Sequence, residues 1–162
     1  MRISDPKLIT FNEDAKKKLL SGAKQIADAV GATMGPGGQL VIYRDHTSPW
    51  PVATKDGVSV ARKVFLKDPE ENLGAMMVNQ AANRQLFETG DGTTLTCVLA
   101  YEMLKYFFEG KDGASIEARI FELDMVIQDV IGELKNAARQ CKKLDTLKNV
   151  AVISANGDKE LG

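Results

Sequence analysis

Gly90-Asp91-Gly92-Thr93-Thr94 lies where one apolar-periodic segment ends and the next begins, so it leads directly into a helix N-terminus. The two glycines allow positive φ and let a ligand approach the backbone closely. The threonine hydroxyls lie beside the unpaired amides of the first helical turn, where phosphate binds well. Asp91 supplies the hard oxygen that Mg²⁺ prefers. The stretch indicates a nucleotide-phosphate loop, although Asp-Gly followed by Thr is also an ordinary turn and helix cap.

Size and composition favour one globular domain. The chain has 162 residues, of which 44% are hydrophobic and 27% charged, which is ordinary for a protein with a packed core. The net charge is −1 and no basic block stands out, so we expect no nucleic-acid partner. The run Lys16-Lys17-Lys18 is interpreted as a solvated helix face.

Targeting and cysteine patterns favour a cytoplasmic protein with no membrane partner. No apolar run reaches transmembrane length, and the N-terminus lacks the layout of a signal peptide. Cys97 and Cys141 lie within apolar helical patterns, as small buried or half-buried side chains do in a reducing compartment. Nothing in the pattern calls for a disulfide between them, although the sequence leaves that pairing open.

Hydrophobic periodicity predicts a mainly α fold with one small β-hairpin. Residues 1–10 are expected to be extended. The other expected elements, in chain order, are a helix capped by Asn12 that ends near Gly35-Pro36-Gly37-Gly38, strands at 40–43 and 50–54, a short helix at 58–64, a helix from Asp68-Pro69 to about Glu88, a helix opening at Thr93, a long helix capped by Ser115, and a shorter helix at 144–152.

Three loops combine glycine with groups that suit phosphate or metal. They are Thr33-Met34-Gly35-Pro36-Gly37-Gly38, Thr54-Lys55-Asp56-Gly57 and Gly90-Asp91-Gly92-Thr93-Thr94. No glycine-rich segment ends in Gly-Lys-Ser/Thr, and no dinucleotide fingerprint joins a strand to a helix. The single histidine, His46, lies in a proline-bounded turn, and the cysteines lie far apart, which argues against both a zinc site and a catalytic triad.

The ordered set of these motifs resembles the N-terminal part of a GroEL-type group I chaperonin. The order and spacing hold over essentially the whole chain. The residues that carry the resemblance are Ala27-Asp28-Ala29-Val30, Thr33-Met34-Gly35-Pro36, Thr54-Lys55-Asp56-Gly57-Val58-Ser59-Val60-Ala61-Arg62, Glu71-Asn72, Gly74-Ala75, Met77-Val78, Gly90-Asp91-Gly92-Thr93-Thr94, Val98-Leu99-Ala100, Ile153-Ser154-Ala155-Asn156 and Asp158.

The resemblance implies an ATPase site with ATP, Mg²⁺ and K⁺ as cofactors. Asp91 would hold Mg²⁺, and backbone oxygens of Thr33 and Lys55 would serve K⁺. Asp56 would be the catalytic residue, orienting or helping to deprotonate the attacking water; its alternative is a turn aspartate. The residues implied in nucleotide binding are Thr33, Met34, Gly35, Pro36, Lys55, Gly57, Gly90, Gly92, Thr93, Thr94, Leu95 and, against the adenine, Ile153.

The resemblance also implies a homo-oligomeric ring that folds unfolded client proteins with a co-chaperonin lid. Residues 1–138 would be the N-terminal part of an equatorial, ATP-binding domain, and residues 139–162 the start of an intermediate, hinge-like domain. Family subunits are much longer, so we expect a fragment, a truncated product or part of a split assembly. The rest of the equatorial and intermediate domains and the apical domain would be absent, and apolar helix faces would be exposed.

Four positions depart from the usual family pattern. Gly37 stands where lysine is common and Gln39 where arginine is common, Leu95 replaces a third threonine, and Gly113 replaces a proline. These changes put nucleotide affinity and hydrolysis rate in doubt.

Two other functions remain open. A structural or interaction module that keeps the scaffold but does not hydrolyse ATP is one alternative. An unrelated phosphate-ester enzyme with convergent glycine loops is the other, and the ordered match across the chain speaks against it.

Overall fold

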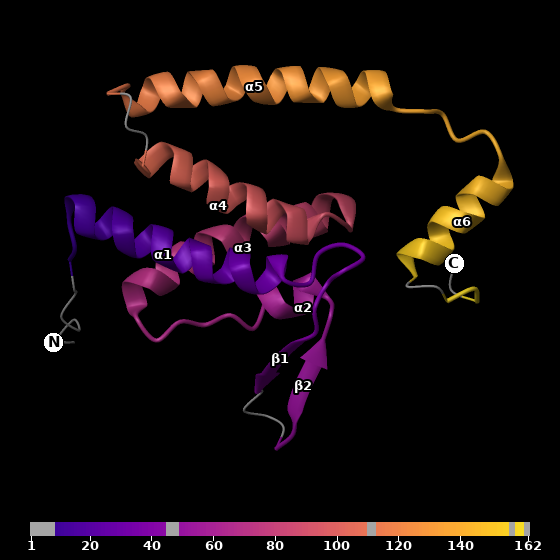
Figure 1. The fold of residues 1–162 in the computed structure, drawn as a ribbon, viewed down its shortest axis with the longest axis horizontal. Coiled ribbons are helices and arrows are strands. Elements are labelled where there is room, and N and C mark those ends of the chain that lie inside the picture. Colours follow the sequence, from indigo (N-terminus) through magenta and orange to yellow (C-terminus); the bar gives the residue numbers. More distant parts are fainter. Residues whose placement is uncertain (1–8, 45–48, 110–112, 156–157, 161–162) are drawn as a thin grey trace, which may run out of the picture. The chain divides into compact units, whose positions relative to one another are not determined.

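The fold is mainly helical with one β-hairpin, as the sequence predicts (Figure 1). The structure is a computed structural model, and it describes residues 9–44, 49–109, 113–155 and 158–160. His46 and most of residues 1–10 lie outside these ranges. The elements are α1 (Asn12–Gly31), β1 (Val41–Arg44), β2 (Pro51–Thr54), α2 (Gly57–Ala61), α3 (Pro69–Thr89), α4 (Thr93–Glu109), α5 (Ile116–Ala137) and α6 (Leu144–Ser154).

The chain forms two compact units, Met1–Ala114 and Ser115–Gly162. The first unit holds the hairpin and the helices α1 to α4, and the second holds α5 and α6. The predicted domain boundary after residue 138 falls inside the second unit, between its two helices, and stays a prediction.

Two glycines bring the backbones of α1 and α3 into contact in the first unit. A Cβ on Gly22 would collide with the carbonyl of Glu71, and a Cβ on Gly74 would collide with the carbonyl of Leu19. Only glycine permits so close an approach of two backbones. We refer to this contact as the glycine crossing.

The core of the first unit lies where α1, α3 and α4 pack together. Its largest fully buried side chains are Ile26, Val30, Val78 and Cys97. Burying an aliphatic side chain of this size contributes about 1.5–3 kcal/mol, so Ile26, Val30 and Val78 each stabilise the unit by about that amount.

The hairpin pairs β1 with β2 in antiparallel register, from Val41 opposite Thr54 to Arg44 opposite Pro51. Both strands are edges of a two-stranded sheet, so a proline can occupy the strand without breaking a central ladder. Val41 packs against the core of the unit, which anchors the hairpin to the helices.

Several helix boundaries follow from local capping. The Asp68 side chain accepts hydrogen bonds from the amides of Glu70 and Glu71, and Pro69 occupies the first helical position of α3, as predicted. Ser115 caps α5 through the Ala118 amide, also as predicted.

Other boundaries differ from the expectation. Phe11, not Asn12, is the N-cap of α1, and it gives no side-chain cap bond. Asn12 is instead the first helical residue, with a φ of 53°, a left-handed value that asparagine tolerates better than most residues. Helix α1 ends at Gly31, before the glycines at 35–38, and α6 continues to Ser154.

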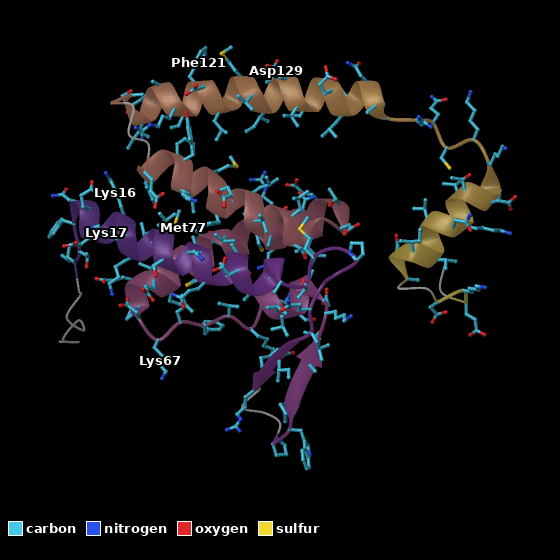
Figure 2. The ribbon with its side chains drawn as sticks, in the orientation of Figure 1. Lys16, Lys17, Lys67, Met77, Phe121 and Asp129 are labelled. Carbon is cyan, nitrogen blue, oxygen red and sulfur yellow. The ribbon has the colours of Figure 1, made fainter. Side chains whose placement is uncertain are left out.

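The run of three lysines is only partly solvated. Lys16 pairs with Glu13 at 2.8 Å, and Lys17 is exposed near the start of α1 (Figure 2). Lys18, however, forms an ion pair with Asp68, the residue that caps α3. The third lysine therefore links the first turns of α1 to the start of α3.

Large apolar side chains are exposed along α5 and α6, which confirms the expectation of exposed apolar helix faces. Phe121, Met125, Val130 and Leu134 on α5 are each more than half exposed. Within the described residues, no helix has both the length and the apolar character needed to cross a lipid bilayer.

Candidate functional site

One residue from each of the three predicted loops lies at a common junction, which is centred on Gly57, the first residue of α2. A Cβ on Gly57 would collide with the Thr94 hydroxyl and would lie 3.2 Å from the Thr33 hydroxyl. Thr33 follows α1, and Thr94 lies in the first turn of α4, so residues 33, 57 and 94 are neighbours in space. Gly57 is buried at their junction.

The loop that follows α1 is folded by its own backbone. The Thr33 hydroxyl donates to the carbonyl of Val30 at 2.7 Å, and the backbone N–H of Gln39 donates to the carbonyl of Ala32 at 2.7 Å. Gly35 has a φ of 73°, and a Cβ there would meet nothing within 4 Å, so this side of the loop is open. Met34 is about half exposed beside it. An open turn with a left-handed glycine suits close approach of a ligand.

Asp56 is the N-cap of α2. Its carboxylate accepts from the amides of Val58 at 3.3 Å and Ser59 at 3.0 Å, and from the Ser59 hydroxyl at 2.6 Å. Burial acts to raise the pKa of Asp56, but the three hydrogen bonds hold it below its ordinary value. The carboxylate is therefore ionised at neutral pH. Asp56 thus has a structural role as a helix cap, where the sequence offered a turn aspartate as the alternative, and its catalytic role stays a prediction.

Two left-handed glycines shape the turn from α3 to α4. Gly90, with a φ of 76°, ends α3, and its amide donates to the carbonyl of Leu86 at 2.9 Å. Gly92 has a φ of 82° and precedes the first residue of α4. The Asp91 carboxylate is exposed and accepts from the Gly92 amide at 2.6 Å. We refer to residues 90–94 as the 90–94 loop.

Two α3 side chains that sequence reasoning did not single out bind the 90–94 loop. The Gln85 side-chain amide donates to the Thr89 hydroxyl at 2.9 Å and to the Asp91 carbonyl at 3.1 Å. The Thr89 hydroxyl lies 2.9 Å from the same carbonyl. Their spacing of four residues on one helix face, just before a glycine turn, is the signal that points to them.

The remaining predicted residues are placed as follows. Thr93 is buried, and Leu95 is about half exposed in the first turn of α4. Lys55 is exposed and lies between the end of β2 and the cap of α2. Ile153 lies in α6, which belongs to the second unit, and its side chain is 75% exposed. Its predicted contact with the adenine base stays a prediction.

The donor set at these loops fits a phosphate-bound Mg²⁺. Among the described residues, no three acidic, histidine or cysteine side chains gather at one point to hold a metal by themselves. Mg²⁺ commonly uses one or two carboxylates and takes its other ligands from phosphates and water. One exposed carboxylate, Asp91, beside the amide-rich start of α4 matches that pattern.

An apolar groove on α3 and α4 is separate from these loops. Its volume is about 440 Å³, and Met77, visible in Figure 2, lines it together with Leu99, Met103 and Phe107. It includes none of the predicted site residues. The candidate site is the polar junction of loops, which lies apart from this groove.

Solved chaperonin structures share the arrangement of this chain. The chaperonin gp146 from the bacteriophage EL 2 (Pseudomonas aeruginosa), in a crystal structure determined in the presence of ATP-BeFx, matches 96% of this chain and 27% of its own. The TM-score is 0.79 and the identity 30%. A group III chaperonin in the open state matches 90% of this chain and 29% of its own with a TM-score of 0.75; at 23% identity it supports the fold alone.

Sequence comparisons lead to the same family. The chain is 39% identical, over its full length, to the RuBisCO large subunit-binding protein subunit alpha, chloroplastic, of Chlamydomonas reinhardtii. It spans 28% of that protein's length. The model of the TCP-1/cpn60 chaperonin family matches residues 26–161. These matches confirm the resemblance found in the motifs, and the chain belongs to the TCP-1/cpn60 chaperonin family.

Proposed function

We propose that this chain is the nucleotide-binding and ring-contact segment of an ATP-dependent chaperonin subunit that assists protein folding. The observation that carries the proposal is the junction at Gly57, where the hydroxyls of Thr33 and Thr94 meet. Left-handed glycines in the first and third loops, together with helix N-terminal amides beside this junction, suit a bound polyphosphate.

Each loop has a distinct role in this proposal. The 90–94 loop holds the phosphates with the first amides and hydroxyls of α4, and Asp91 supplies the carboxylate for Mg²⁺. The loop at 33–36 lines the nucleotide from the side of α1, and backbone oxygens of Thr33 and Lys55 serve K⁺. Leu95 and Ile153 add apolar contacts. ATP supplies the phosphoryl group, and positioning by these residues supplies most of the catalysis.

Asp56 is the proposed catalytic carboxylate. Its pKa, held low by the Ser59 and Val58 hydrogen bonds, keeps it ionised at neutral pH, as orienting a water requires. Its three donors also fix the side chain at the start of α2, beside Gly57. A fixed, ionised carboxylate next to the loop junction supports this role.

The proposed assembly is a homo-oligomeric ring with unfolded protein clients and a co-chaperonin. Membership of the chaperonin family supports it, as do the exposed apolar side chains. The chain spans less than a third of the relatives that it matches. Client binding is proposed for the apical domain of the whole subunit. A cytoplasmic location is likewise proposed; the algal relative is chloroplastic by its name.

The proposal is tested by a calorimetric titration of this chain with Mg-ATP. We expect binding that Asp91→Ala weakens by at least about tenfold, or 1.4 kcal/mol, because the carboxylate proposed to bind the metal is lost. Asp129→Ala, which removes an exposed carboxylate on α5 (Figure 2), is the matched control and should bind like the wild type. Wild-type protein that binds no Mg-ATP would contradict the proposal.

A second candidate is an interaction module that keeps the scaffold without ATP turnover. Two observations favour it. Leu95 offers no hydroxyl in the first turn of α4, and the Asp56 carboxylate is already engaged as a helix cap. Phosphate release from Mg-ATP separates the two candidates, because measurable Mg-dependent hydrolysis by this chain excludes the module.

A further inference from the structure

We propose that Gln85 is a positioning residue that fixes the peptide between Asp91 and Gly92. Its side-chain amide holds the Asp91 carbonyl toward α3, so that the Gly92 N–H faces the opposite way. The two hydrogen bonds of the Gln85 side chain follow from atomic distances in the structure. The effect of Gln85 on phosphate and Mg²⁺ binding rests on the function proposed above.

The orientation of the Gln85 amide follows from its partners. The Asp91 carbonyl oxygen is an acceptor only, so the group that faces it at 3.1 Å must be the NH₂ and not the amide oxygen. The NH₂ has two protons, and the second is directed to the Thr89 hydroxyl at 2.9 Å. Gln85 is half-buried, so water competes only partly for these bonds.

Thr89 alone cannot perform the same task. Its hydroxyl has one proton and lies within hydrogen-bond distance of two carbonyls, that of Gln85 at 3.0 Å and that of Asp91 at 2.9 Å. A threonine in a helix commonly donates to the carbonyl four residues earlier. Whenever it does so here, the Gln85 amide is the side-chain donor left for the Asp91 carbonyl.

Fixing this carbonyl also fixes the direction of the next amide. In a trans peptide the C=O and the N–H point in opposite directions. With the Asp91 carbonyl turned toward α3, the Gly92 N–H points away from α3 and meets the Asp91 carboxylate at 2.6 Å. The amide and the carboxylate are thus presented together at the start of α4.

Glycine at position 92 leaves the preceding peptide less constrained than another residue would. Its φ of 82° and its lack of a Cβ let the peptide rotate more freely than any other residue would. The Gln85 nitrogen would lie 3.3 Å from a Cβ at Gly92, so the two residues are in close contact. A glycine-rich loop is open to a ligand, but its backbone samples more conformations unless a side chain holds it in one of them.

The test uses Gln85→Glu and Gln85→Leu, with Gln80→Glu as the matched control. Gln85→Glu keeps the shape but replaces the donor by a carboxylate that repels the Asp91 carbonyl. Gln85→Leu removes the donor without charge. Gln80→Glu makes the same charge change on an exposed position of the same helix.

The first readout is hydrogen exchange of the Gly92 amide, followed by NMR without nucleotide. We expect both Gln85 variants to exchange at least about fivefold faster than the control, the ratio that corresponds to one net hydrogen bond. Melting temperatures should fall by only about 2–4 °C relative to Gln80→Glu, the shift that the loss of one hydrogen bond produces in a chain of this length, because the core is not touched. Unchanged exchange at Gly92 would overturn the clamp.

The second readout is Mg-ATP affinity. We expect Gln85→Glu to bind at least about fivefold more weakly than Gln80→Glu, again the size of one hydrogen bond. Faster exchange with unchanged affinity would overturn the role of Gln85 at the site. If the wild type binds no Mg-ATP, the proposed function fails, and the exchange measurement still decides whether Gln85 holds the peptide.

Discussion

Gly57 is the residue at which a single added methyl group should disturb the site most directly. In Gly57→Ala the new Cβ would collide with the Thr94 hydroxyl and crowd that of Thr33. We expect a loss of about 1–3 kcal/mol in the free energy of unfolding, typical of overpacking, together with weaker Mg-ATP binding. Gly37→Ala is the control, since a Cβ there meets nothing within 4 Å. Equal denaturant midpoints for the two variants would contradict the predicted junction.

The two cysteines should differ sharply in reactivity. Cys97 is fully buried in the core, and burial raises the pKa of its thiol to about 11. At pH 8 it is almost entirely protonated, and only the thiolate reacts. Cys141 is exposed between α5 and α6. A thiol reagent at pH 8 should therefore modify Cys141 in the native protein and Cys97 only after unfolding. Peptide mapping measures the label on each cysteine, and equal labelling of both in the native protein would refute this prediction.

At the level of elements, the cap of α2 should make stability depend on pH. Asp56→Ala should cost about 1 kcal/mol at pH 7, the usual value of an N-cap. The folded-state pKa of Asp56 lies below its ordinary, unfolded value. The stabilisation by its charge is therefore complete above the unfolded pKa of about 4 and is lost as pH falls through the folded pKa.

Urea unfolding of wild type and Asp56→Asn between pH 7 and pH 2.5 measures this dependence. Asparagine is also a good N-cap, so it removes only the charge. The difference between the two proteins should narrow as pH falls below about 4. A difference that stays constant with pH would show that the carboxylate charge contributes nothing to the cap.

The glycine crossing should be the least tolerant point between two elements. Gly74→Ala places a Cβ against the Leu19 carbonyl, which belongs to a helix backbone and cannot turn aside. We expect a loss of at least about 1–3 kcal/mol, even though alanine favours a helix. Gly132→Ala on α5 meets nothing within 4 Å and should stabilise by about 0.5–1 kcal/mol. Thermal melts of the pair should shift in opposite directions.

For the molecule as a whole, exposed apolar side chains should lead to self-association. Phe121, labelled in Figure 2, is 67% exposed, and Met125 on the same helix is 55% exposed. Sedimentation velocity over a range of concentrations should show larger species for the wild type and fewer for Phe121→Lys with Met125→Lys. A wild type that stays monomeric throughout would contradict this expectation.

Most elements of the fold could be predicted from sequence because their signals are local. The sequence signals are Asp68-Pro69, Ser115 and the apolar run Leu40-Val41-Ile42-Tyr43, and each specifies an element through nearby residues. The start of α1 was misplaced at Asn12 because the cap position carries Phe11, which has no capping side chain. The Lys18–Asp68 pair was missed because it joins residues 50 apart in the chain.

The candidate site was predictable as a set of loops but not as a geometry. The family resemblance implies that Thr33, Gly57 and Thr94 belong to one site. The three residues are neighbours in space, and their binding of a nucleotide stays a prediction. The engagement of Asp56 and the contacts of Gln85 depend on side-chain positions that no motif encodes. The predicted contact of Ile153 depends in addition on how α6 meets the first unit.

The glycine crossing also gives the site a mechanical property. From this crossing, α1 leads to Thr33 and α3 leads to the 90–94 loop, and both of these segments contribute to the junction at Gly57. At 1.5 Å per residue, the end of α3 lies about 22 Å from Gly74. A change of about 5° in the angle between α1 and α3 would move that end by about 2 Å. The spacing of the two loops is thus sensitive to a backbone contact in the middle of both helices.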